Sequence, residues 1–474
     1  MKPPILVWFR HDLRIADNPA LSEATDSGHP VVPVFILDPK AGRAAGAASL
    51  WWLHQSLNSL AQQFQKLRTP LLLRRGDSVD VLTALAKETG AQTIHWNETS
   101  DATLAAFDRA ATAALADQGL TARAFLGSAL LHEPLGGLRT REGKPFQVFT
   151  PFWRAALDRM PPGLPLPAPK KLLPCEVQLK SERLEDWRLL PIKPDWAEGF
   201  REAWEPGEVN AAARLEYFLE DRAASYGDAR NFPARDGHSG LSPHLHFGEV
   251  TPRQIWHRAD TAKNAAFLRE VGWRDFCQNL LHHFPTMAAE PLRSEFKRFP
   301  WREDAEALRA WQRGLTGYPL VDAGMRELWR TGFMHNRVRM VVASFLVKHL
   351  LLHWRHGEAW FWDTLVDADH GNNVANWQWI AGCGADAAPY FRIFNPVLQG
   401  ERFDPQGAYV RRWVPELAEL PDRFIHHPWD ASVIELEAAG IRLGKTYPSP
   451  IVEHDGARKR ALAAFARLKE SRPG

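Results

Sequence analysis

The chain has 474 residues, of which 45% are hydrophobic and 24% charged, and its formal net charge is +2. This length exceeds what one hydrophobic core supports, so two or three domains are expected, and the charge balance excludes a global basic field. No run of 18 or more apolar residues is present, and the N-terminus lacks a signal peptide's apolar segment. We therefore expect a cytoplasmic protein with no membrane partner.

The first 130 residues alternate between short apolar runs and segments with a helical period. The runs are 5–9, 31–36, 71–73, 93–96 and 122–125. Helix-like segments of ten or more residues separate them, such as 50–67 and 79–89. This alternation predicts an α/β domain at 1–130, with a parallel, Rossmann-like sheet covered by helices. No GxGxxG follows the first run, so a dinucleotide fingerprint is not expected there.

The chain changes character twice after residue 130. Prolines are dense between 161 and 206, which predicts an interdomain linker over 131–206 that is proline-rich in its second half. From 207 to 474, stretches rich in Leu, Ala and Arg at a helical period replace the strand pattern, for example 305–312 and 337–352. This part is predicted to be an all-α domain.

Cysteine and tryptophan usage narrows the chemistry. Cys175, Cys277 and Cys383 are far apart and lack CxxC spacing, which predicts neither a disulfide framework nor a metal cluster. The chain holds 20 Trp but only 6 Tyr. Most of these indoles are expected in the core, although indoles also stack on rings and carry electrons.

The most informative run is 367–379, which carries two carboxylates, a carboxamide and two indoles. If the run is helical, Asp369, Asn373 and Trp377 lie at i, i+4 and i+8, on one face. Acids beside aromatic bulk indicate a polar ligand held next to a ring system. The alternative is a polar helix that enters the core through its tryptophans, and the spacing alone favours neither.

A second candidate is the loop that leads into a helix near Ser242. Ser239, Ser242 and the free backbone N–H groups of a helix start could bind a diphosphate. The alternative is N-capping by Ser242, with Pro243 at the first helical position.

Two further clusters combine polar, basic and aromatic groups. One holds Glu270, Trp273 and Arg274 within five residues, and the other holds Asn336 and Arg337 beside a further arginine. Each cluster alone is typical of a solvated helix face. Together they offer guanidinium groups for phosphates and indole planes for bases, which indicates DNA better than the net charge does.

With these motifs side by side, the sequence resembles the DNA photolyase/cryptochrome family over essentially its whole length. The resemblance rests on the segments 8–18, 149–152, 316–323 and 372–395. It implies an N-terminal α/β domain, a linker, and an all-helical domain that binds FAD in a folded conformation. Within the family, the chain is most similar to photolyases that act on cyclobutane pyrimidine dimers.

The resemblance assigns cofactor contacts residue by residue. The implied FAD contacts are Tyr226, Ser239, Leu241, Ser242, Arg339, Asp367, Asp369 and Asn373. Arg339 would pair with Asp367, and Asn373 would face flavin N5. The family's Thr and Arg within the diphosphate loop are replaced here by His238 and Gly240, which weakens the assignment at those two positions.

Three indoles match the family's electron-transfer chain, namely Trp377, Trp354 and Trp301. Such a chain would let an electron reach a buried flavin from the surface. The alternative is that all three are core residues.

The implied activity is light-driven repair of UV-damaged DNA, in which excited, fully reduced FAD passes an electron to a flipped-out dimer. The residues implied at the lesion are Glu270, Trp273, Arg274, Asn336, Arg337, Met340 and Trp379. Glu270 would hydrogen-bond a thymine carbonyl, and Asn336 would reach the same pocket. The two indoles would stack on bases, and the two arginines would hold phosphates.

Two positions bear on the choice within the family. Met340 stands where enzymes acting on (6-4) photoproducts carry His, and Asn373 stands where plant-type cryptochromes carry Asp. Both favour repair of cyclobutane dimers over the alternative, a blue-light photoreceptor with little repair activity.

We expect a monomer. A second antenna chromophore, folate or deazaflavin, stays open because Thr103, Leu104 and Ser49 replace the family's binding residues.

Overall fold

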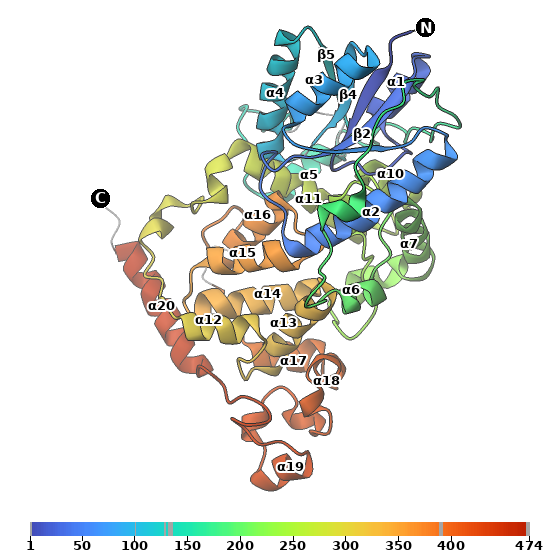
Figure 1. The fold of residues 1–474 in the computed structure, drawn as a ribbon. Coiled ribbons are helices and arrows are strands. Elements are labelled where there is room, and N and C mark those ends of the chain that lie inside the picture. Colours follow the sequence, from blue (N-terminus) through green and yellow to red (C-terminus); the bar gives the residue numbers. More distant parts are fainter. Residues whose placement is uncertain (1, 100, 128, 131–135, 388–391, 471–474) are drawn as a thin grey trace.

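The computed structural model describes all residues except 1, 100, 128, 131–135, 388–391 and 471–474 (Figure 1). An α/β region formed by the N-terminal part of the chain lies against a larger helical region (Figure 1). The start of the predicted linker, residue 131, lies outside the described residues.

Five parallel strands form one sheet in the order β3-β2-β1-β4-β5. They are β1 (Ile5–Phe9), β2 (Val31–Leu37), β3 (Leu72–Arg75), β4 (Thr93–Glu98) and β5 (Thr121–Leu126). The helices between them are α1 (Pro19–Asp26), α2 (Ala47–Lys66), α3 (Ser78–Thr89) and α4 (Ala102–Asp117). The predicted parallel α/β arrangement is confirmed.

Alternate residues of β1 enter two separate hydrophobic cores. Val7 and Phe9 pack with α1 and α2, whereas Leu6 and Trp8 pack with α3 and α4. Because helices cover both faces of the sheet, its central strands are almost continuously apolar. This double burial explains why the short runs of the sequence marked the strands well.

The helical region is built from many short helices. They are α7 (Glu208–Asp221), α8 (Tyr226–Ala229), α9 (Ser242–His246), α10 (Pro252–Arg258), α11 (Ala265–His283), α12 (Ala305–Gln312), α13 (Pro319–Thr331), α14 (Asn336–Ser344), α15 (Trp354–Thr364), α16 (His370–Ala381), α17 (Pro396–Phe403), α18 (Ala408–Trp413), α19 (Val433–Ala438) and α20 (His454–Glu470). The predicted all-α character is confirmed. The expected helix 337–352 instead leaves α-geometry after Ser344 and continues as a π-helical turn, Phe345–His349.

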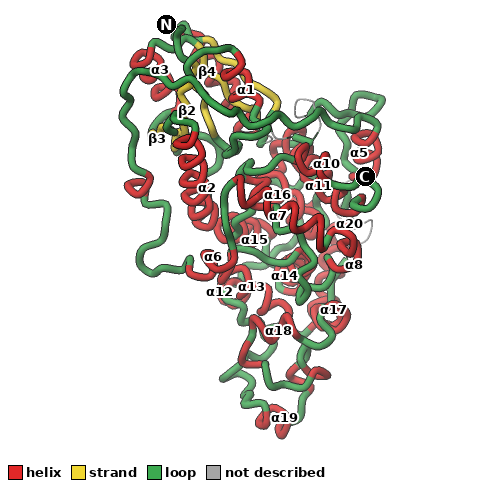
Figure 2. The backbone as a smooth tube through the Cα atoms, turned by 90° about the vertical axis from the view of Figure 1, so that its right-hand side faces the viewer, coloured by secondary structure: helices red, strands yellow, loops and turns green. Residues whose placement is uncertain are grey.

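The segment between the two regions has two parts. Helix α5 (Phe149–Leu157) packs on α11, where the ring of Phe152 contacts that of Phe276. The proline-rich part then runs along the side of the molecule as a long loop with one short helical turn, down to α6 (Glu198–Ala203) (Figure 2). It is tied to the sheet, because Val31 N donates to Leu173 O.

Candidate active site

Three predicted cofactor contacts that are distant in sequence meet in space. Arg339 Nη2 donates to the two carboxylate oxygens of Asp367 at 3.1 and 2.9 Å, and Ser242 Oγ donates to Asp367 Oδ2 at 2.6 Å. The Asp367 side chain is only 5% exposed. A buried carboxylate requires such donors, so this cluster is a fixed polar group at the junction of α9, α14 and the loop before α16.

The loop that is predicted to bind a diphosphate is not a simple helix cap. Ser242 is the first residue of α9, its hydroxyl bonds to Asp367, and the N-cap residue Leu241 makes no side-chain capping bond. The alternative of N-capping by Ser242 is therefore wrong. Ser239 Oγ accepts from Leu241 N at 3.3 Å, which orders the loop. Tyr226 is buried against the rings of Phe218 and Phe267.

Asp369 lies at the N-cap of α16 rather than within the helix. Its carboxylate accepts from the backbone N–H of Asn372 and from Gln278 Nε2, the latter at 2.5–2.6 Å. The expected three-residue face is thus reduced to Asn373 and Trp377, because a short carboxylate at this position satisfies a free helix N–H. Asn373 is buried, and its Nδ2 donates to Glu358.

The three indoles of the predicted chain range from the core to the surface. Trp377 and Trp354 are buried, whereas Trp301 is partly exposed. A Cβ on Gly357 would lie 2.0 Å from the Trp377 ring, so this glycine lets the indole press against α15, one turn from Trp354. The ring of His353 lies 5.2 Å from Trp301 and 5.5 Å from Trp354. The structure therefore brings these side chains into one neighbourhood.

Glu270 has a partner that the sequence did not reveal. Arg230 Nη1 donates to Glu270 Oε1 at 2.5 Å, and the Arg230 guanidinium lies 5.2 Å from the centre of the Tyr226 ring. Arg230 follows α8 and begins the loop that carries predicted cofactor contacts, so it joins that loop to the predicted lesion contact. An arginine in a polar loop carries no pattern that would have marked it.

A second set of unpredicted groups surrounds Arg337. Its Nη2 donates to Asn231 Oδ1 at 2.5 Å, and its guanidinium lies 4.4 Å from the centre of the Phe403 ring. Burial and the neighbouring guanidinium groups of Arg230 and Arg402 lower the pKa of Arg337. Three arginines close enough to repel one another form a local basic cluster, as a phosphate contact requires. Asn336 is exposed at the start of α14, and Met340 on the same helix is partly buried.

The two predicted base-stacking indoles are both partly exposed. Trp273 stacks on Phe149 with centroids 3.8 Å apart and an interplanar angle of 8°, so one of its faces is already covered. Trp379 Nε1 donates to Asp386 O. Arg274 is 12% exposed, donates to Leu245 O, and acts electrostatically on His246. Arg274 therefore lies toward the end of α9, and no contact among the described residues places it with Arg337.

Glu327 is hydrogen-bonded to the N-cap residue of α14, His335. It accepts from His335 N at 3.2 Å and from Tyr409 Oη at 2.6 Å. Burial raises the pKa of Glu327 to about 7. Between about pH 4.5 and pH 7, the Glu327 carboxyl keeps its proton in the folded state and loses it in the unfolded state. The free energy of unfolding therefore falls as pH rises through this range and no longer changes through Glu327 above it.

We therefore expect Glu327→Gln to become more stable than the parent as pH rises. The unfolding free energy of the variant relative to the parent should rise by about 3 kcal/mol from pH 4.5 to pH 8. Urea unfolding at both pH values measures this difference. A difference that stays constant would show that Glu327 titrates normally.

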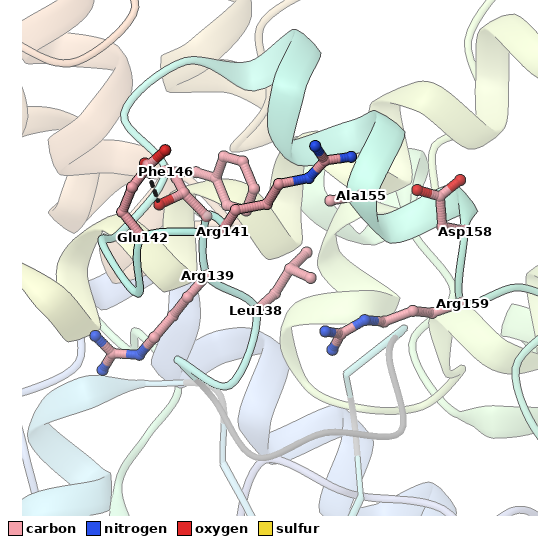
Figure 3. A pocket seen from close by; sticks show the side chains of 9 residues that line it. Leu138, Arg139, Arg141, Glu142, Phe146, Ala155, Asp158 and Arg159 are labelled. Atoms are coloured by element: carbon pink, nitrogen blue, oxygen red, sulfur yellow. Dashed lines mark hydrogen bonds between the residues drawn. The ribbon is translucent and has the colours of Figure 1, made fainter.

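A separate pocket of about 380 Å³ lies beside α5 (Figure 3). Its lining residues are Leu138, Arg139, Thr140, Arg141, Glu142, Phe146, Ala155, Asp158 and Arg159. It contains none of the predicted site residues. Figure 3 shows Arg141 extending across it toward Ala155. The pocket adds positive charge next to the helix that supports Trp273.

The positions considered for a second chromophore are mostly internal. Ser49 is buried in α2, and the adjacent Trp51 and Trp52 belong to the core between α2 and the sheet. Thr103 Oγ1 contacts Asp101. Across the described part of the chain, no helix is both long and apolar enough to cross a membrane, and no group of His, Cys, Asp and Glu is arranged for a metal.

Comparisons with known proteins agree with this geometry. A family model for DNA photolyase matches residues 5–170, and one for the FAD binding domain of DNA photolyase matches residues 267–467. The deoxyribodipyrimidine photo-lyase of Agrobacterium fabrum is 51% identical over 99% of this chain and 98% of that protein. Cryptochrome-2 of Arabidopsis thaliana is 38% identical over 99% of this chain and 80% of its own length.

Solved structures give the same result. The crystal structure of a bacterial class III photolyase from Agrobacterium tumefaciens matches with a TM-score of 0.96 and 49% identity, over 99% of this chain and 98% of that chain. The family models and this relative together span both regions of the fold. The chain therefore belongs to the DNA photolyase/cryptochrome family.

Proposed function

We propose that this protein is a photolyase that binds FAD and uses light to repair cyclobutane pyrimidine dimers in DNA. The observation that carries the proposal is the convergence of Ser242, Arg339 and Asp367 in front of α16, the helix that carries the buried amide of Asn373. When bound, FAD would supply the light absorption and the transferred electron.

The donor set fits such a cofactor. Among the described residues, His238 Nδ1 and Gln278 Oε1 are buried side-chain atoms that lack a hydrogen-bond partner. Unsatisfied buried polar atoms are costly, and the Gln278 nitrogen already donates to Asp369, so the Gln278 oxygen is available to a polar ligand beside that carboxylate. We assign Ser239, Ser242 and the adjacent backbone to the diphosphate, Asp369 to the sugar region, and Asn373 to the flavin ring.

The lesion would be held on the other side of Glu270. Flipping a dimer out of the duplex costs roughly a few kcal/mol, less for a damaged pair, and stacking returns about 1–3 kcal/mol per base. Trp273 is partly exposed and Phe149 covers one of its faces, so only the opposite face could take part in such stacking. Arg337 sits in the basic cluster with Arg230 and Arg402, which suits a phosphate beside the lesion.

The side chains at the lesion favour a cyclobutane dimer. The Met340 thioether cannot donate a proton and suits an apolar ring. Glu270 is held by Arg230, so its second oxygen can accept a hydrogen bond from the damaged base. Asn336 is exposed at the start of α14 and can reach the same pocket.

Glu270→Ala tests this assignment. Removing a charged hydrogen-bond partner costs about 1.5–3 kcal/mol, so we expect the repair yield to fall about tenfold or more while FAD stays bound. The assay is illumination of reduced protein with dimer-containing DNA, followed by lesion counting.

The matched control is Glu216→Ala, which removes a carboxylate from an ion pair with Arg258 outside the site. The control should repair normally. Equal repair by the parent and Glu270→Ala would remove Glu270 from the site. FAD binding without any repair would favour the photoreceptor.

Three properties stay predictions. They are a second antenna chromophore, a monomeric state and a cytoplasmic location. The absorption spectrum of protein purified from its own host would decide the first, because folate and deazaflavin absorb differently from FAD.

A further inference from the structure

A residue of the α/β region reaches into the flavin-site region of the helical part. Arg43, in the loop between β2 and α2, donates through Nη1 to Glu358 Oε1 at 2.5 Å and through Nη2 to Oε2 at 3.1 Å. Glu358 lies on α15 with a side chain that is 6% exposed. Two parallel bonds between a guanidinium and a carboxylate fix both groups in one plane, so Arg43 determines the orientation of Glu358.

Glu358 in turn determines the orientation of the Asn373 amide. Asn373 Nδ2 donates to Glu358 O at 2.9 Å and to Glu358 Oε1 at 2.8 Å. A backbone carbonyl and an ionised carboxylate both act only as acceptors. The atom of the Asn373 amide that faces them is therefore its nitrogen. The amide oxygen therefore points the other way, and it makes no hydrogen bond to any residue that the structure describes.

The loop that carries Arg43 is anchored independently of Glu358. A Cβ on Gly46 would lie 2.2 Å from Trp362 O, so the loop approaches α15 as closely as a glycine permits. Trp362 Nε1 donates to Ala44 O at 2.8 Å, and Ala47 N donates to Asp363 Oδ1 at 2.9 Å. Helices α2 and α15 lie side by side in both views (Figures 1 and 2).

We propose that Arg43 is a positioning residue for the flavin site, because its ion pair with Glu358 holds the Asn373 amide with the carbonyl oxygen toward the cofactor. The inference rests on the proposed function in one respect, namely that FAD is the group beside Asn373. It goes further by assigning a role in cofactor chemistry to the α/β region.

The expected consequence follows from hydrogen-bond polarity. A carbonyl oxygen accepts from the N5–H group of reduced flavin, whereas an amide NH₂ donates to the bare N5 of oxidised flavin. The orientation held by Arg43 therefore favours the reduced form, which is the form that repair requires. Without Arg43, no pair of parallel bonds holds the Glu358 carboxylate in this plane, so the carboxylate can move away from the Asn373 nitrogen and the amide can turn.

Arg43→Gln tests the proposal through the midpoint potential of the bound flavin. Loss of one hydrogen bond of ordinary strength should lower the ratio of reduced to oxidised flavin about tenfold at a fixed solution potential. This corresponds to a downward shift of about 30 mV for a two-electron couple. Arg43→Lys retains the charge but cannot make both bonds to Glu358, so we expect it to recover only part of the parent's midpoint potential.

The matched control is Asp363→Ala, which removes the neighbouring contact to Ala47 at the same interface without touching Glu358. We expect no shift in potential for this variant. An equal shift in Asp363→Ala and Arg43→Gln would mean that loosening of the interface is the cause, which would overturn the proposal.

A second measurement does not depend on FAD. In cofactor-free protein labelled with ¹⁵N at asparagine, the Asn373 amide hydrogens should exchange with solvent about tenfold faster in Arg43→Gln than in the parent. The Asn373→Ala variant identifies the signal. Unchanged exchange would overturn the role of Arg43, even if no variant bound FAD. If neither the parent nor any variant bound FAD, the proposed function would be refuted, but the role of Arg43 in orienting the amide would not.

Discussion

Illumination of the Trp301→Phe variant should no longer reduce its oxidised flavin, whereas repair by protein reduced beforehand should continue. Trp301 is the partly exposed member of the three indoles, and the ring of His353 joins its neighbourhood to that of Trp354. Phenylalanine has a similar shape but is much harder to oxidise than an indole. We expect the yield of photoreduction to fall about tenfold or more, since each 1.4 kcal/mol of barrier is a factor of ten.

Transient absorption after a laser flash measures this directly. The matched control is Trp429→Phe, at a partly buried indole that packs against the same core but contacts Tyr318 instead. The control should photoreduce normally. If Trp301→Phe also photoreduces normally, Trp301 does not belong to the electron-transfer chain, and another surface residue must supply the electron.

The variant Arg253→Met should lose about 3 kcal/mol of stability. Arg253 pairs with Asp17, and the two side chains are 7% and 0% exposed. Breaking a buried pair from one side leaves an uncompensated charge and costs about 3–5 kcal/mol. We expect the low end because Thr251 Oγ1 still donates to Asp17 Oδ2 and Arg14 remains beside it. Because the pair joins the α/β region to the helical region, FAD binding should also weaken.

Urea unfolding followed by flavin fluorescence would test both effects. The comparison is Arg201→Met, which breaks an ion pair with Asp195 whose side chains are 49% and 44% exposed. Solvent already screens that pair, so its unfolding midpoint should not change measurably. Equal midpoints for the two variants would contradict a structural role for the buried pair.

Much of the fold could be predicted from local sequence patterns. Strands buried on both faces appear as continuous apolar runs, which is why β1 was predicted to the residue and the other strands to within a few positions. The change from α-helix to π-helix after Ser344 could not be predicted, because a continuous apolar stretch is compatible with either. The packing of α5 against α11 likewise left no sign in the segment that precedes the prolines.

The residues proposed for the site were marked in the sequence only where motifs carried them. Asp367, Asn373 and Arg339 were marked by such motifs, and the first and last of these meet in the structure. Arg43, Glu358 and Arg230 were not predicted. Each acts through a partner that is far away in the sequence or lies in a loop without periodicity, and only the fold brings the partners together. The cofactor chemistry was therefore available from the resemblance, and the supporting contacts were not.

The central claim is that the cluster of Ser242, Arg339 and Asp367 binds FAD beside a lesion pocket that ends at Glu270. The most direct measurement is lesion content in dimer-containing DNA after incubation with the reduced, FAD-loaded protein, in blue light and in darkness. We predict that dimers disappear in light and persist in darkness. Persistence of dimers in light, with FAD fully reduced and the DNA bound, would contradict the account.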